Sequence, residues 1–366
     1  MIPYIIAIAF TLLSMVSGKY MYMRRATISR KKSGDKKDVS IIIPARNEAK
    51  NLPKLLNSIA KDPQIEVIVM DDDSTDNTLA IAKYYDAKVN TVNNDMTWKG
   101  KSHACWEGSQ YATNDLLMFI DSDVQFTSDD SIWRILYQYS LQGNKGLLSI
   151  QPFHKIKHLY ENCSAIFNLM TVVGMNKFSI NRSLNERQSA FGPLILTNKR
   201  DYELTHGHLN AKDKVIEGFA LSNVYHNNDL PVDLFEGQDV VNFRMYPQGF
   251  RALLEGWSKH FALGSKATKR ATLSLIVLWL LGSSISTLSI LFSLKLGILY
   301  LILAVTIYFI YALQFHKFIR RTGDFNFIAS IGHPLLFVCF IGIFFKSWLD
   351  INVFKRVQWK GRNIDL

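Results

Sequence analysis

The sequence has 366 residues, enough for one large domain or two smaller ones, and 48% of them are hydrophobic. This apolar fraction excludes intrinsic disorder, and three cysteines at unrelated spacings (Cys105, Cys163 and Cys339) exclude a disulfide framework. The formal charge of +11 would suit nucleic-acid binding, but the basic residues cluster beside apolar segments, as they do in membrane proteins.

The first segment, residues 2–16, carries no charge and has about the shortest length that spans a bilayer. A basic block follows it, so the positive-inside rule places the middle of the chain in the cytoplasm. A nucleic-acid arm is the alternative, but the juxtamembrane position explains the block without nucleic acid. We predict a transmembrane anchor at 1–18 and a basic linker at 19–38. The basic residues of this block are Lys19, Arg24, Arg25, Arg30, Lys31, Lys32, Lys36 and Lys37.

Residues 39–262 alternate between strand and helix patterns, which is typical of an α/β domain with a mainly parallel sheet. The expected strands are 39–43 (ended by Pro44), 65–70 and 116–120. The expected helices are 48–59, 78–85 and one that begins near Lys101. Ligands of such sheets bind beyond the carboxyl ends of the strands. Since polar residues follow all three strands, at 46–48, 71–73 and 121–123, we predict a ligand site there.

The chain becomes apolar again after residue 270, and we predict a C-terminal membrane region at 263–366. Residues 273–294 and 296–313 are each long enough to span, and basic residues follow them. A third apolar run, 325–345, is interrupted at 332–334. If this run spans, the basic residues after it lie outside, against the positive-inside rule; a re-entrant or interfacial segment would keep them inside. Both alternatives remain open.

Asp121 and Asp123 are the strongest candidates for chemistry, because they follow the apolar run LLMFI. Two carboxylates at a strand end can hold a hard cation, Mg²⁺ or Mn²⁺, which neutralises a diphosphate leaving group. An isolated Asp-x-Asp pair is more often a turn or a solvated cap. Its position after a buried strand favours the metal site.

Residues 71–78 carry four carboxylates, of which Asp76 is suited to the start of the following helix. Asp71 or Asp72 would then face a ligand, since a carboxylate accepts hydrogen bonds from an imide or from ribose hydroxyls. Lys99, Gly100 and Lys101 begin another helix, where a cation and free N–H groups suit phosphate. The chain has neither a P-loop nor a glycine-rich dinucleotide motif, which argues against a P-loop nucleotidase and a nicotinamide enzyme.

Four segments in this order resemble the inverting family 2 glycosyltransferases of GT-A fold: VSIIIPARNE (39–48), VIVMDDDSTDNT (67–78), GKSHACWEG (100–108) and FIDSDVQF (119–126). Residues 191–203, 215–222 and 244–264, together with the apolar segments, resemble the carotenoid branch of that family. The resemblance implies a GT-A nucleotide-diphospho-sugar transferase domain at 39–262. It also implies that glucose moves from UDP-glucose to the carboxylate of a membrane-dissolved carotenoid acid, with other enzymes of that pathway as partners and no nucleic acid.

The resemblance further assigns roles to residues. Donor-binding residues would be Pro44, Ala45, Glu48, Asp72, Lys101 and Asp121, metal ligands Asp121 and Asp123, and catalytic residues Glu217, Asp123 and Lys101. The family carries a Glu-Asp pair whose Asp is the usual base, whereas this chain has Glu217-Gly218. A carboxylic acid acceptor is already ionised near neutral pH and needs no base, which agrees with the missing Asp. Three roles for Glu217 remain open: it is a base, it orients the acceptor, or it merely pairs with a lysine.

On the acceptor side the resemblance favours Arg244 and Trp257. Trp257 would stack on a sugar or a polyene, or else be buried at an interface. Processive polymerases carry Gln-x-x-Arg-Trp, and the Trp is missing after Gln248 and Arg251, which argues against a polymerase. A transferase acting on polyisoprenyl phosphate or another lipid, and a non-catalytic membrane scaffold, are the rival functions.

Overall fold

The computed structural model describes residues 1–31, 37–93, 98, 100–180, 189–212, 217–353, 356–359 and 362–365. Lys32, Lys36, Lys99 and residues 215–216, which the sequence analysis includes, lie outside these ranges. The chain forms two compact units, each assembled from separate stretches. The sheet unit comprises Ala26–Phe153 and Asn185–Arg244, and the helical unit comprises Met1–Arg25, His154–Leu184 and Met245–Leu366.

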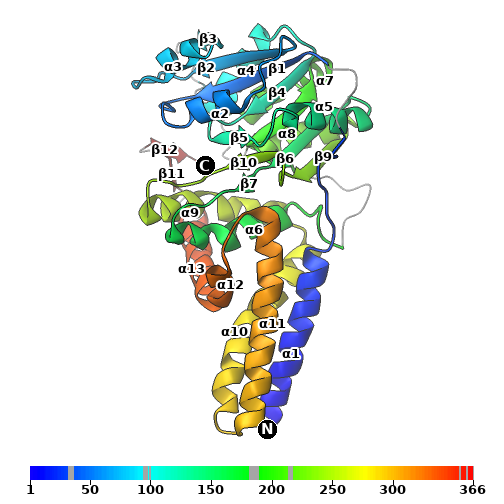
Figure 1. Ribbon diagram of the computed structural model, residues 1–366, viewed down its shortest axis with the longest axis vertical. Helices are drawn as coiled ribbons and strands as arrows, with labels where there is room; N and C mark the ends of the chain where they lie inside the picture. Colours follow the sequence, from blue (N-terminus) through cyan, green and yellow to red (C-terminus); the bar gives the residue numbers. More distant parts are fainter. Residues whose placement is uncertain are drawn as a thin grey trace. The chain divides into compact units, whose positions relative to one another are not determined.

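The sheet unit contains a seven-stranded, mainly parallel sheet, as the sequence predicts (Figure 1). In spatial order its strands are β3 (Lys88–Thr91), β2 (Ile65–Asp71), β1 (Val39–Ala45), β4 (Leu116–Ile120), β8 (Leu194–Asn198), β6 (Leu147–Gln151) and β9 (Val232–Glu236). Only β8 runs antiparallel to its neighbours, β4 and β6. Strands β1, β2 and β4 therefore end at the same edge, which brings their polar C-terminal residues together.

Strand β1 continues through Pro44 to Ala45, so the expectation that Pro44 ends the strand is wrong. Proline lacks an N–H donor and is tolerated in a sheet where no neighbour needs that donor. The pairing of β1 with β4 ends at Ile42, before the proline, whereas pairing with β2 continues to Ala45. Pro44 therefore costs no ladder hydrogen bond on the β4 side, and the strand reaches the site.

Helices and two short strands complete the sheet unit. They are α2 (Leu52–Ser58), α3 (Thr78–Tyr84), α4 (Lys101–Tyr111), β5 (Val124–Phe126), α5 (Ser131–Leu141), α7 (Lys199–Leu204), the 3₁₀ helix η2 (Gly207–Ala211), α8 (Glu217–Asn227) and β10 (Val241–Phe243). Strand β7 (Phe153–His154) lies where the chain passes between the units. Helix α2 begins four residues later than the expected 48–59, because side chains of the next loop hold the N–H groups of Glu48 and Ala49.

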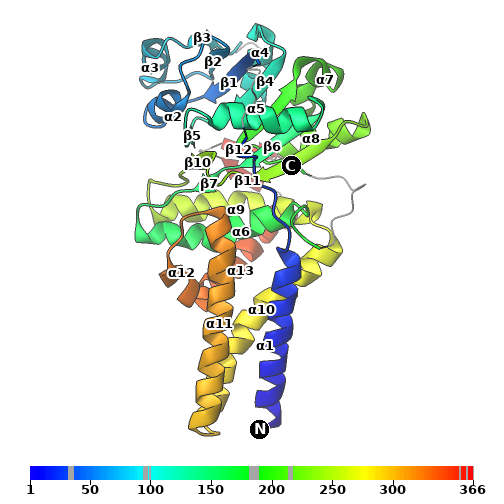
Figure 2. The same ribbon diagram turned by 45° about the vertical axis from the view of Figure 1, so that its right-hand side comes forward.

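Among its described residues, the helical unit contains three helices that are long and apolar enough to cross a membrane: α1 (Ile2–Met21), α10 (Arg270–Ser293) and α11 (Ile298–Thr322). They lie side by side in Figures 1 and 2. Small residues allow this approach, since a Cβ on Gly282 of α10 would overlap Ser14 of α1. The remaining elements are η1 (Leu159–Cys163), α6 (Ser164–Gly174), α9 (Phe250–Ala267), α12 (Phe327–Ile331), α13 (His333–Asn352), β11 (Arg356–Trp359) and β12 (Arg362–Asp365).

Helix α11 extends nine residues beyond the expected end at Leu313, to Thr322. No helix breaker occurs before Gly323, and the basic residues of the last turn complement the helix dipole. Arg321 also donates hydrogen bonds to the carbonyl oxygens of Tyr22 (2.8 Å) and Arg24 (2.5 Å). The basic residues expected to follow the span therefore belong to the helix.

The third apolar run forms two helices, α12 and α13, separated at Gly332. His333, at the turn between them, hydrogen-bonds Ser283 of α10 (2.6 Å) and lies against the ring of Tyr308 of α11. The turn therefore lies beside the middle of α10 and α11, while Asp324, before α12, donates its N–H to the carbonyl oxygen of His154. This hairpin geometry favours the re-entrant alternative over a full span.

The compact units do not coincide with the domain predicted at 39–262. Residues 154–184 and 245–262 belong to the helical unit. The reason is the apolar character of α6, whose side chains from Ser164 to Met170 are all buried against other helices of that unit. The chain thus passes from the sheet unit to the helical unit after Phe153 and is in the sheet unit again at β8.

Candidate functional site

The candidate site lies at the carboxyl edge of β1, β2 and β4. Glu48 follows β1, Asp72 follows β2, and Asp121 follows β4 directly. Lys101 is the first residue of α4, and Glu217 is the first residue of α8. The structure thus brings the residues from three predicted strand ends together with two helix N-termini.

Lys101 is the centre of this arrangement. Its Nζ lies 2.6 Å from Asp121 Oδ1, forms an ion pair with Glu217 Oε1, and donates to the carbonyl oxygen of Gly192 at 3.2 Å. An ammonium group has three donors, so all of them have partners here. Burial alone would lower the pKa of Lys101, but the charges of Asp121 and Glu217 outweigh it and raise that pKa above its usual value. The side chain therefore stays cationic between two carboxylates.

Asp123 experiences the opposite electrostatic environment. Burial, followed by the charges of Asp121 and Glu48, raises its pKa to about 7, although Lys101 opposes the shift. Carboxylates that crowd one place favour a bound cation, which would relieve their repulsion. In the described part of the chain no group of three or more His, Cys, Asp or Glu side chains converges, so Asp121 and Asp123 would supply only two ligands. Mg²⁺ is commonly bound this way, with substrate phosphates and water completing its shell. The residues fit a divalent ion on a diphosphate.

The segment Ala190–Pro193 passes beneath Lys101 and is firmly held. Ser149 of β6 accepts the N–H of Phe191 (2.7 Å) and donates to its carbonyl oxygen (2.8 Å). Asp121 donates its N–H to the Pro193 carbonyl oxygen (2.9 Å). Four hydrogen bonds, with that of Lys101 to Gly192, therefore fix the backbone that faces the start of α8.

Gly218 packs directly against this fixed segment. A Cβ at position 218 would lie 2.3 Å from the carbonyl oxygen of Ala190 and 3.4 Å from the nitrogen of Gly192. The nearer contact is with backbone, which cannot rotate away as a side chain can. Any residue larger than glycine is therefore excluded unless the segment moves. The aspartate expected at this position from the family pattern has no room here.

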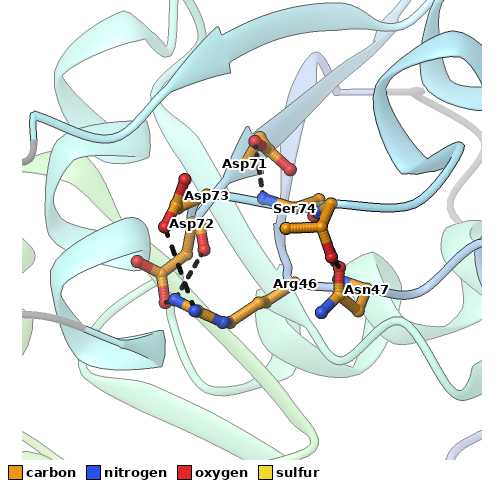
Figure 3. A network of polar contacts seen from close by, with 7 residues as sticks. Arg46, Asn47, Asp71, Asp72, Asp73 and Ser74 are labelled. Carbon is orange, nitrogen blue, oxygen red and sulfur yellow. Dashed lines mark hydrogen bonds and ion pairs between the residues drawn. The ribbon is translucent and has the colours of Figure 1, made fainter.

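The loops after β1 and β2 are linked to each other by hydrogen bonds (Figure 3). Asn47 donates its N–H to Ser74 Oγ (3.0 Å) and accepts the N–H of Thr75 through Oδ1 (2.8 Å). Glu48 donates its N–H to Thr78 Oγ1 (2.9 Å). Asp76, expected to serve the helix start, accepts the N–H of Thr78 (3.0 Å). The predicted donor-binding region is thus held as one piece before any ligand binds.

The two acceptor-side candidates lie in different units. Arg244 follows β10, which pairs antiparallel with β5 through Val124 and Phe243, so the next pair in that register would be Asp123 and Arg244. Trp257 lies in α9 of the helical unit, is 4% exposed, stacks on Phe167 and donates to Ser164 Oγ at 3.0 Å. The structure therefore supports the buried alternative for Trp257 and disagrees with an exposed stacking surface.

Two functional contacts were not foreseen from the sequence. Arg46 reaches across to the loop after β2, and Gly192 supplies a carbonyl oxygen to Lys101. The sequence does indicate that Arg46 lies near the site, because it falls between Pro44 and Glu48 at a strand end. For Gly192 the sequence gives no such indication, because no nearby residue predicts that its carbonyl oxygen accepts a hydrogen bond from Lys101, 91 residues away.

Comparisons with known proteins agree with this geometry. Residues 40–160 match the family described as Glycosyl transferase family 2. The 4,4'-diaponeurosporenoate glycosyltransferases of Staphylococcus aureus strains MRSA252 and USA300 are each 45% identical over 97% of this chain and 96% of their own length. The mannosyltransferase PcManGT from Pyrobaculum calidifontis, solved with GDP-Man and Mn²⁺, has a TM-score of 0.50 at 16% identity, over 91% of this chain and 99% of its own, a likeness of fold alone. This chain belongs to glycosyltransferase family 2 and is a sugar transferase.

Proposed function

We propose that this enzyme transfers glucose from UDP-glucose to the carboxylate of 4,4'-diaponeurosporenoate, with inversion, as a step of carotenoid biosynthesis. The acceptor is the one in the names of the Staphylococcus relatives. The acceptor oxygen forms a bond to the anomeric carbon while the bond from that carbon to UDP breaks, and its electron pair leaves with UDP. An ionised acid has no proton to lose, so the balance of the reaction requires no base.

The observation that carries this proposal is the lack of space at Gly218, where a Cβ would lie 2.3 Å from the Ala190 carbonyl oxygen. It leaves no room for the family's catalytic aspartate, and the neighbouring Glu217 is ion-paired with Lys101. A hydroxyl acceptor needs a base, which contributes ~10²–10⁴-fold to the rate. A carboxylic acid, with a pKa near ~4.3, is ionised at neutral pH without one. The site therefore suits an acceptor that arrives as an anion.

Asp121 and Asp123 would hold Mg²⁺ or Mn²⁺, and the bound ion would supply positive charge for the departing diphosphate. The chain's own contribution is Lys101, which keeps its charge beside Asp121 and stands at the N-terminus of α4, where N–H groups also favour phosphate. Pro44 and Ala45 at the end of β1, with Glu48 and Asp72, would line the uridine pocket, and Arg244 would lie on the acceptor side.

The location we propose is the cell membrane, multi-pass, with the sheet unit in the cytoplasm. Three helices have the length and composition for crossing a membrane, and the basic linker beside α1 favours a cytoplasmic sheet unit. The water-soluble donor would thus reach the enzyme from the cytoplasm, and the lipid-soluble acceptor would reach it from the membrane. Other enzymes of the carotenoid pathway are its proposed partners.

A polyisoprenyl phosphate is the second candidate acceptor. It is also lipid-soluble and anionic, so the missing base at Gly218 suits it equally. The two acceptors differ in the product, which is a glycosyl ester in one case and a phosphodiester in the other.

Mass spectrometry of pigments tests the proposal. Co-expression with enzymes that make the carotenoid acid should yield that acid with one added hexose, and alkaline hydrolysis should release the sugar, because it is held as an ester. An unmodified acid in cells that accumulate the folded protein would count against this acceptor. Hexosylated polyisoprenyl phosphate in the same extract would establish the second candidate instead.

Glu217→Gln should lower transfer to the carotenoid acid by clearly less than about 10²-fold, because an ionised acceptor needs no general base. Rates with purified protein should be measured across pH, where the variant and the wild type should share the same profile on the basic side. The Glu217 carboxylate is closely packed, since a Cβ added to Gly192 would lie 3.1 Å from its Oε1. Glutamine has the same shape as glutamate and is therefore the suitable replacement. Loss of activity at neutral pH with donor and acceptor affinities intact would show that Glu217 is the base.

A further inference from the structure

We propose that Arg46 makes the donor site prefer uracil to guanine: it occupies one carboxylate oxygen of Asp72 and leaves the other for a single N–H of the base. This inference rests on the proposed UDP-sugar donor and on Asp72 as the residue that meets the base. Arg46 is then a positioning and specificity-determining residue, because it acts through Asp72.

The geometry of Arg46 is visible in Figure 3, where its side chain extends from the end of β1 toward the carboxylates that follow β2. Its Nη1 donates to the backbone oxygen of Asp72 (3.0 Å) and lies 3.5 Å from Asp72 Oδ2. Its Nη2 lies 4.0 Å from Asp73 Oδ2. The hydrogen bond to the backbone holds the guanidinium beside one oxygen of the Asp72 carboxylate.

The other oxygen, Asp72 Oδ1, is buried and has no hydrogen-bond partner within the part of the chain that the structure describes. The side chain of Asp72 is only 8% exposed, so water does not readily replace that partner. A buried acceptor left without a donor is destabilising. The loops after β1 and β2 are linked through Asn47, so this oxygen is held in position. It can accept a hydrogen bond from one donor.

Base chemistry decides which ring fits one free oxygen. Uracil presents a single imide N–H, so one acceptor satisfies it. Guanine presents two adjacent donors, its ring N–H and its amino group, which together match both oxygens of one carboxylate. Because Arg46 holds Oδ2, bound guanine would bury one N–H donor without an acceptor. This lowers the affinity for guanine by about tenfold or more.

The test uses the full-length protein in detergent with Mn²⁺, and measures the affinities of UDP and GDP by calorimetry. Wild type should prefer UDP. Arg46→Met frees Asp72 Oδ2, and the ratio of the two affinities should fall by about tenfold or more. Arg46→Lys keeps a cation near that oxygen and should retain most of the preference. Asp73→Asn is the matched control: Asp73 is 65% exposed and 4.0 Å from Arg46, and its loss should leave the ratio unchanged.

The ratio separates specificity from damage, because a loosened loop weakens both nucleotides alike. An unchanged ratio in Arg46→Met would overturn the role of Arg46 while leaving the UDP donor intact. A wild type that binds UDP no better than GDP would overturn the proposed donor, and the inference with it.

Discussion

Replacing Asp123 by Asn is expected to lower sugar transfer by ~10²–10³-fold or more, the usual effect of removing one interaction with charge that develops in the transition state. One of the two carboxylates that would hold the cation is gone, while the amide keeps the shape of the side chain. The same substitution should leave thermal stability unchanged or raise it. The opposite directions of these two effects distinguish the prediction from simple damage to the fold.

The stability effect follows from the raised pKa of Asp123, about 7 in the folded protein against about 3.9 in an unfolded chain. Between these values the folded state binds more protons, so stability falls as the pH rises from about 4 to about 7. Above pH 7 the ionised carboxylate opposes folding because of burial and of its neighbours Asp121 and Glu48. Asparagine removes this charge.

Thermal unfolding at pH 8 should be measured in chelator and in Mn²⁺, with transfer assayed in parallel. Wild type should gain stability from Mn²⁺, and Asp123→Asn should gain little. Asp129→Asn, a change of the same kind at an exposed position six residues away, should behave as wild type. Asp123→Asn protein that retains more than about a tenth of the transfer rate at saturating Mn²⁺ would exclude the metal role.

Replacing Lys101 by Met should have a comparable effect on activity and the reverse effect on stability. Without the ammonium group, Asp121 and Glu217 face each other with no cation between them, and the Gly192 carbonyl oxygen loses its donor. We expect destabilisation of ~3 kcal/mol, the low end of the range for breaking a buried ion pair, because Lys101 and Asp121 are 27% and 28% exposed. Transfer should fall by ~10²-fold or more, since a cation at the phosphate end of the site is lost.

Chemical unfolding and single-turnover transfer would measure both effects. Lys83→Met, at an exposed lysine near the end of α3, is the matched control and should change neither. A Lys101→Met protein as stable as wild type would mean that the ion pairs contribute nothing to folding.

The strands and the carboxyl-edge site were predictable because they depend on local patterns. Short apolar runs such as 39–43 and 116–120 are typical of buried strands, and polar residues directly after parallel strands lie at one edge of the sheet. The start of α2 was not predictable, since it depends on backbone N–H groups donating to Asp76 and Thr78, which follow a different strand. Long-range contacts of this kind cannot be recognised in the local sequence of the segment whose structure they change.

The contacts that complete the site were beyond sequence reasoning for the same cause. The Lys101 cluster joins α4, the end of β4, the segment before β8 and the start of α8. Each residue type is common, and only the fold shows that they converge. The assignment of 154–184 to the helical unit also needed the structure, because an apolar helix such as α6 suits a soluble core and a helical bundle equally well.

The close packing of Gly218 against Ala190 has a consequence for how this enzyme can evolve. A single codon change that brought aspartate back to position 218 would put its Cβ into a carbonyl oxygen whose segment is held by Ser149. The variant would lose folding before it gained a base, so selection could not retain it as a first step. An aspartate at position 218 would therefore require the 190–193 segment to shift beforehand.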